Sequence, residues 1–175
     1  DIFGSLSNAK MGSRAALEQS RAYQQAVQSQ LIATIADTYY SLLMLDEQLD
    51  ITRRTAKSWQ ETVQSLQALM RAGEQNQAAV AQAEASRLTA EQSVLSLEKQ
   101  IKELENSLST LVGIVPQAIE RGTLSEAVFS EQLSVGIPLQ LLGKRPDVRQ
   151  AEYALAEAFY ATNQARSAFY PQITL

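Results

Sequence analysis

The stretch "RAGEQNQAAV", residues 71–80, separates two long helix-forming runs and decides the fold. Gly73 can take the left-handed backbone conformation that ends a helix. Asn76 can accept a hydrogen bond from the free backbone N–H groups at the start of the next helix. Two helices joined by so short a polar turn pack as an antiparallel hairpin. The stretch therefore predicts a helical hairpin with its tip at residues 71–77.

The arm before the tip reads as one long helix. From Ser5 or Ser7 to Arg71 there is no proline, and Gly12 is the only glycine. Apolar and small residues then recur at alternating steps of four and three, which is the heptad spacing of a coiled-coil seam. This predicted seam is Leu31, Ile35, Thr38, Leu42, Leu45, Leu49, Thr52, Ala56, Trp59, Val63, Leu66 and Met70. Before residue 31 the seam is weaker and runs through small residues and Tyr23.

The arm after the tip keeps the same rhythm but is only about half as long. It is predicted to end near Val112, just before Gly113. Its seam is Val80, Ala83, Arg87, Ala90, Val94, Leu97, Ile101, Leu104, Leu108 and Leu111. Arg87 on this seam can line an interior space or bridge to Glu84 or Glu91 on the neighbouring turns, and we expect its stem to pack while its charge reaches water. Because the arms are unequal, half of the long helix needs another partner.

That partner is predicted at residues 145–170, after an irregular segment at 113–144 that holds one or two short helices. Pro146 suits the first turn of a helix. Asp147 places a negative charge at the positive end of the helix dipole, and Arg145 is expected to pair with a neighbour there. The predicted seam of this helix is Val148, Ala151, Leu155, Ala158, Thr162, Ala165 and Phe169. Residues 171–175, "PQITL", begin the alternating pattern of a strand.

Composition excludes most chemistry. The chain has no histidine and no cysteine, so a Ser-His-Asp triad and a thiolate or two-histidine metal site are impossible. Its net charge of −4 with interspersed signs does not favour nucleic acid. Carboxylates such as Asp46 with Glu47, and Glu103 with Glu105, point apart on a helix and are predicted to be solvated. We expect no catalytic, cofactor-binding or metal-binding residue and hence no enzyme.

Several blocks of the sequence resemble a known family. "KRPDVRQAEYALAEAFYATNQARSAFYPQITL", residues 144–175, resembles the block of TolC-like outer-membrane efflux proteins in which Arg-Pro-Asp opens a helix that leads into a strand. "DIFGSLSNAK", "RAGEQNQAAVAQAEAS" and "LSTLVGIVP" resemble, in the right order, the segment after the family's first barrel hairpin, its first hairpin tip and the segment after the returning helix. The NodT-type outer-membrane factors are the most similar subgroup.

The resemblance implies a fold and a function. Three subunits of such a protein form a β-barrel in the outer membrane that continues as a helical tunnel across the periplasm. This chain is then expected to be a periplasmic piece of a longer protein, all-α, with a long hairpin of unequal arms plus a third half-length helix. Its divisions are expected to be the hairpin at 1–112, the equatorial segment at 113–144, the half-length helix at 145–170 and the start of a barrel strand at 171–175. Membrane contact is expected only through barrel strands outside the chain.

The expected partners follow from the same resemblance. They are a periplasmic adaptor (membrane fusion) protein, an inner-membrane pump of the resistance-nodulation-division (RND) type and, in the full-length protein, two further subunits of a trimer. The expected adaptor contact is the tip, namely Arg71, Ala72, Gly73, Glu74, Gln75, Asn76 and Gln77. The role expected for Arg145, Pro146 and Asp147 is structural. The alternative function is the hairpin of an adaptor protein or a coiled-coil scaffold with no channel role.

Overall fold

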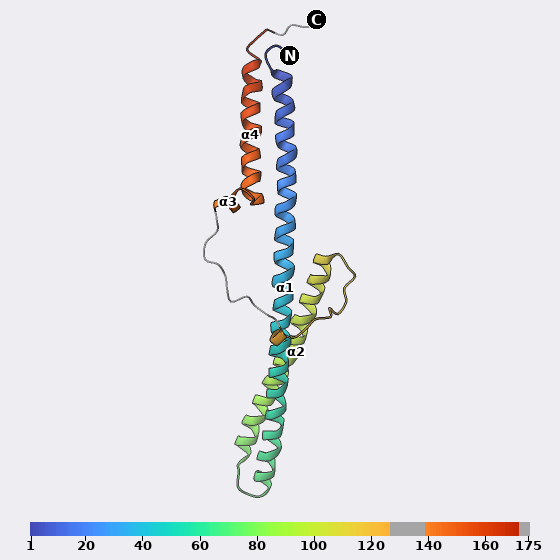
Figure 1. The fold of residues 1–175 in the computed structure, drawn as a ribbon. Coiled ribbons are helices and arrows are strands. Elements are labelled where there is room, and N and C mark those ends of the chain that lie inside the picture. Colours follow the sequence, from blue (N-terminus) through green and yellow to red (C-terminus); the bar gives the residue numbers. More distant parts are fainter. Residues whose placement is uncertain (127–138, 172–175) are drawn as a thin grey trace. The chain divides into compact units, whose positions relative to one another are not determined.

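A computed structural model describes residues 1–126 and 139–171 of the chain (Figure 1). The helices are α1 at Ser5–Arg71, α2 at Gln77–Val112, α3 at Leu139–Leu142 and α4 at Pro146–Ser167, with a short 3-10 turn, η1, at Leu124–Glu126. No strand occurs in these described ranges, so the predicted all-α class is confirmed. The predicted strand start falls, apart from Pro171, outside the described residues.

The chain divides into two compact units, and α1 contributes to both. One unit is residues 33–129, and the other is residues 1–32 with 130–175. In the first unit the C-terminal half of α1 packs against α2 as an antiparallel hairpin (Figure 1). Its core is a layer of leucine and isoleucine from both arms: Leu42, Leu45, Leu49, Leu97, Ile101 and Leu108. All six lie on the predicted seams, so the heptad reading of the hairpin is confirmed.

In the second unit the N-terminal part of α1 packs against α4 mainly through small residues. The buried or half-buried positions of α1 there include a row of Asn8, Gly12, Ala15, Gln19, Ala22 and Ala26. A Cβ built on Gly12 would lie 3.6 Å from the Cβ of Tyr160, so the two helices approach closely at this point. Tyr23, which was expected on the seam, is 58% exposed.

The predicted seam of α4 is wrong beyond its first residue, Val148. Leu155 is 74% exposed and Phe169 is 92% exposed. The row of α4 that is at least half-buried at heptad spacing is instead Arg149, Tyr153, Ala156, Tyr160, Asn163 and Ser167. The physical reason is complementarity of size. Glycine and alanine predominate in the row on α1, and these small residues leave room for tyrosine rings that larger side chains on α1 would fill.

Candidate functional site: the hairpin tip and an arginine clasp

The tip begins where Gly73 ends α1. Gly73 has a φ of 79°, in the left-handed region, and its N–H donates to the carbonyl of Met70 at 3.1 Å. The N–H of Glu74 donates to the carbonyl of Leu69 at 2.9 Å. This pair of bonds satisfies the last carbonyls of the helix and is the Schellman arrangement that favours glycine at this position. The glycine is required by its backbone angle alone, since no atom lies within 4 Å of a Cβ built there.

Asn76 starts α2 on the other side of the turn. Its backbone is extended, and its side-chain Oδ1 accepts a hydrogen bond from the N–H of Ala79 at 2.9 Å. An asparagine cap of this kind contributes about 1 kcal/mol to the helix that it starts. The turn is therefore closed by two local signals, both of which the sequence displays.

The seven tip residues are all exposed. Their charged groups are one cation, Arg71, and one anion, Glu74, and three of the others carry side-chain amides. Directly behind the tip, Val63, Val80 and Ala83 are buried. The structure thus presents a polar loop, rich in side-chain amides, on a firmly packed base. That this loop contacts an adaptor protein stays a prediction.

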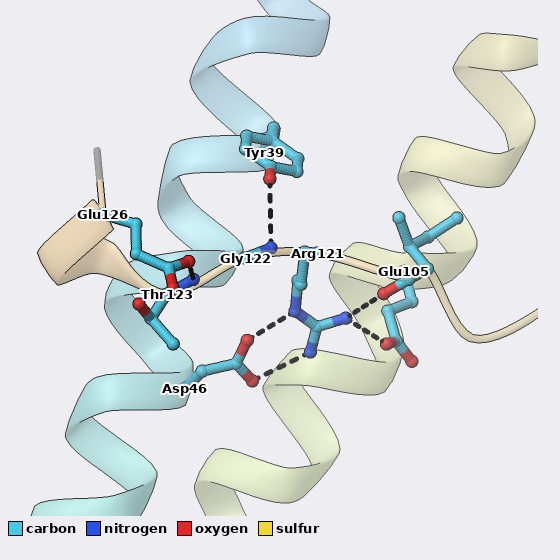
Figure 2. Close-up of polar contacts among 8 residues, drawn as sticks. Tyr39, Asp46, Glu105, Arg121, Gly122, Thr123 and Glu126 are labelled. Atoms are coloured by element: carbon cyan, nitrogen blue, oxygen red, sulfur yellow. Dashed lines mark hydrogen bonds and ion pairs between the residues drawn. The ribbon is translucent and has the colours of Figure 1, made fainter. Parts of the chain in front are cut away.

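A second polar centre, the arginine clasp, lies where the chain leaves α2 and crosses back over the hairpin (Figure 2). We use this name for Arg121 with Asp46 of α1 and Glu105 of α2. The guanidinium donates through Nε and Nη2 to the two oxygens of Asp46, the latter at 2.8 Å, and through Nη1 to Glu105 at 2.6 Å. Nη1 also donates to the carbonyl of Ile119 at 2.9 Å. One side chain therefore ties the crossing segment to both arms.

Burial makes the clasp more than a surface ion pair. The side chains of Arg121 and Glu105 are 13% and 14% exposed, whereas Asp46 is 37% exposed. The hydrogen bonds to Asp46 raise the pKa of Arg121 above its ordinary value, so the guanidinium stays charged at any physiological pH. Next to it, Ile119 packs on the core of the hairpin and the N–H of Gly122 donates to the Tyr39 hydroxyl at 3.4 Å.

Sequence reasoning missed this clasp. Glu105 was predicted to be solvated, and that prediction is wrong, because its side chain is 14% exposed and binds Arg121. Asp46 is 37% exposed, but its ion pair with Arg121 was not predicted. Asp46 and Arg121 are 75 residues apart, so no local pattern joins them. One signal was available, which is the recurrence of glutamate at every seventh position of α2: Glu84, Glu91, Glu98 and Glu105. The bridge that the sequence allows for Arg87 is present, to Glu84 at 3.1 Å and to Glu91 at 2.6 Å.

The start of α4 holds an exposed ion pair. Pro146 is the first residue of the helix, and Arg145 before it makes no side-chain cap. The guanidinium of Arg145 instead donates to both oxygens of Asp147, at 3.1 and 2.6 Å. Asp147 also accepts from the N–H of Val148 at 2.9 Å. The hydrogen bonds from Arg145 are the main reason that the pKa of Asp147 is lowered. These contacts orient the first turn of α4, and no ligand role follows from them.

In the described part of the chain, the polar groups of the tip and the arginine clasp are arranged for contacts between segments or proteins rather than for metal binding. No group of three or more Asp and Glu residues there lies close enough to hold a metal ion. Within the same ranges, none of the helices combines the length and the apolar character that crossing a membrane would need. The arrangement can present a polar loop at one end of the hairpin and hold a crossing segment at the other.

Comparison with known proteins places the chain in a family. The model of the outer membrane efflux protein family matches residues 1–114. The pyoverdine export outer membrane protein OpmQ of Pseudomonas putida KT2440 is 31% identical over all of this chain and 37% of its own length. The solvent efflux pump outer membrane protein SrpC of Pseudomonas putida is 30% identical over 37% of its length. The cation efflux system protein CusC of Escherichia coli K12 is 27% identical over 38% of its length.

The chain therefore spans less than two fifths of the length of these relatives. The match to the family model covers both arms of the hairpin and the tip between them. The relatives are efflux proteins and not enzymes, in keeping with the absence of histidine and cysteine from the sequence. This chain belongs to the outer membrane efflux protein family and is part of a protein of the cell outer membrane.

Proposed function

We propose that this chain is the periplasmic tunnel segment of a trimeric outer-membrane efflux channel, which serves as the passive export duct of a tripartite pump. The observation that carries the proposal is the antiparallel hairpin of α1 and α2, with its heptad core and its fully exposed polar tip. Such hairpins can pack side by side to form the wall of a helical barrel. The tip of each hairpin then stays free to contact a partner protein. Transport energy would come from an inner-membrane pump of the RND type.

The tip, residues 71–77, is proposed to contact the periplasmic adaptor protein. A loop rich in amides with one charge of each sign suits a reversible and hydrated interface. The hydrogen bonds of the Gly73 turn and the Asn76 cap favour one conformation of the loop, which lowers the entropy lost on binding. The alternative function, an adaptor hairpin or a scaffold, draws no support from the relatives, which are outer membrane efflux proteins.

Substitution of Gly73 in the full-length protein tests the tip assignment. Proline cannot adopt the φ of 79° and lacks the N–H that Gly73 donates to Met70. Alanine keeps the N–H but is destabilised by about 1–2 kcal/mol in the left-handed conformation. We expect adaptor capture to fall in the order wild type, Gly73→Ala, Gly73→Pro. If Gly73→Pro captures the adaptor and exports substrate as well as wild type, the tip is not the contact.

The oligomeric part of the proposal has its own test. The full-length protein, extracted in detergent, should sediment as a trimer and show the circular dichroism signal of a β-barrel besides that of helices. A monomer without strand signal would refute the channel and favour the scaffold.

A further inference from the structure

The two flanks of the hairpin differ in charge over most of its length. Residues that directly follow a seam residue form one flank, which we call the charged flank. Residues that directly precede a seam residue form the other, which we call the hydroxyl flank. In an antiparallel pair the equivalent flanks of both helices meet along one groove. The charged flank includes Asp46, Arg53, Lys57, Glu91, Glu98 and Glu105. The hydroxyl flank includes Thr55, Thr62, Ser86, Thr89, Ser93 and Ser96.

No charged residue interrupts the hydroxyl flank from Ser41 to Leu69 on α1 or from Ala79 to Gln100 on α2. Its groove, of about 400 Å³, is lined at its rims by Gln48, Thr55 and Ser93 among others. The groove of the charged flank, of about 470 Å³, is lined by ions that include the Arg53–Glu98 pair, whose atoms are 2.6 Å apart. Two grooves of similar size on one hairpin are thus chemically unlike.

Most hydroxyl groups of that flank are already engaged in the helix. The hydroxyl of Thr55 donates to the carbonyl of Ile51 at 2.9 Å, and that of Ser93 donates to the carbonyl of Thr89 at 3.0 Å. Each oxygen keeps its lone pairs for water, while its proton is used. Exposed apolar side chains such as Ile51 stand singly between polar ones on this flank. Between these bounds the flank can therefore be wetted, and it offers no fixed charge that would retain a passing molecule.

The crossing segment occupies the opposite flank. Arg121 binds Asp46 and Glu105, both of which belong to the charged flank. The cavity beside the clasp, of about 480 Å³, is lined by Leu43 and Asp50, which follow seam residues as well, together with residues 119 and 121–124 of the crossing segment. Within the described part of the chain, the irregular segment at residues 119–124 thus lies over the charged flank (Figure 2).

If such hairpins stand side by side as the wall of the proposed duct, one flank of each hairpin faces the bore and the other flank faces outward. A crossing segment on the bore side would obstruct the duct, whereas on the outer side it leaves the duct open. We infer that the hydroxyl flank lines the bore and that the charged flank, with the arginine clasp, faces outward. This rests on the duct proposed above. The consequence is a stretch of wall, at residues 41–69 of α1 and 79–100 of α2, without fixed charge, along which cations, anions and neutral molecules pass without Coulomb trapping.

Two matched cysteine variants of the full-length channel test this orientation. Thr55→Cys lies on the hydroxyl flank and Gln60→Cys on the charged flank, five positions apart on α1, and both native residues are exposed. Each channel is reconstituted in a planar bilayer and labelled with a large polyethylene-glycol maleimide, with labelling verified by mass. We expect the tethered polymer to reduce single-channel current at position 55 and to leave it unchanged at position 60.

The possible outcomes separate the two proposals. A loss of current at position 60 alone, an equal loss at both positions, or no loss at either labelled position overturns the orientation while the duct stands. An unlabelled wild-type trimer that conducts no current refutes the duct itself. As a second readout, Thr55→Lys should make the channel more anion-selective at low salt, where the Debye length is about 30 Å, and Gln60→Lys should not.

Discussion

The arginine clasp makes a quantitative prediction for Asp46→Asn. This change keeps the shape of the side chain but removes the charge that accepts two hydrogen bonds from Arg121. Hydrogen bonds to charged groups contribute about 1.5–3 kcal/mol, and because Asp46 is 37% exposed we take the lower half of that range. A loss of about 2 kcal/mol raises the population of the detached segment about 30-fold, given a factor of ten for each 1.4 kcal/mol. Glu105 still holds Nη1 in this variant, so the hairpin itself should stay folded.

Limited trypsin digestion measures that population, because cleavage after Arg121 requires its side chain to leave the clasp. We expect the rate of this cleavage to rise about 30-fold in Asp46→Asn, by the same free-energy conversion. Arg71, exposed at the tip, serves as an internal control whose cleavage rate should not change. Glu47→Gln, which neutralises the adjacent exposed carboxylate, is the matched control. Equal cleavage rates after Arg121 in Asp46→Asn and wild type would refute the claim that the clasp holds the segment.

Three further predictions concern stability. Leu42→Ala, at a fully buried site, should lower the free energy of urea unfolding by about 2–5 kcal/mol, while Leu95→Ala, at a site 67% exposed, should change it by under about 0.5 kcal/mol. Asn76→Ala should cost about 1 kcal/mol in the same assay by removing the cap of α2, and no loss would contradict the assigned cap. The pKa of the Asp147 carboxyl is lower in the folded protein than in the unfolded chain. This carboxyl therefore stabilises the fold at a pH above its unfolded pKa, and the contribution is lost as the pH falls through its folded pKa. NMR titration should therefore find its midpoint below the ordinary aspartate value, and Arg145→Gln should return it toward that value.

The helix boundaries could be predicted because their signals are local. The tip needs a left-handed residue and a cap, and Gly73 and Asn76 lie where the structure uses them. The hairpin seam could be predicted because leucine and isoleucine at heptad spacing leave only one apolar face to bury. The adaptor contact could be named only from the family resemblance, since the loop shows no chemistry that an ordinary turn lacks.

By itself the sequence determined which residues are helical, where α1 turns back and which faces of the two arms meet, since helix propensity, capping and heptad spacing act within a few residues of one another. Only the tertiary structure decided which face of α4 is buried and which partners Arg121 finds. Tyr160 of α4 lies against Gly12 of α1 and is half-buried, although Leu155 and Phe169 belong to the more apolar row. Arg121 binds carboxylates 75 and 16 residues away. Shape fit and ion pairing depend on what the folded chain brings opposite a side chain, and no local pattern carries that information.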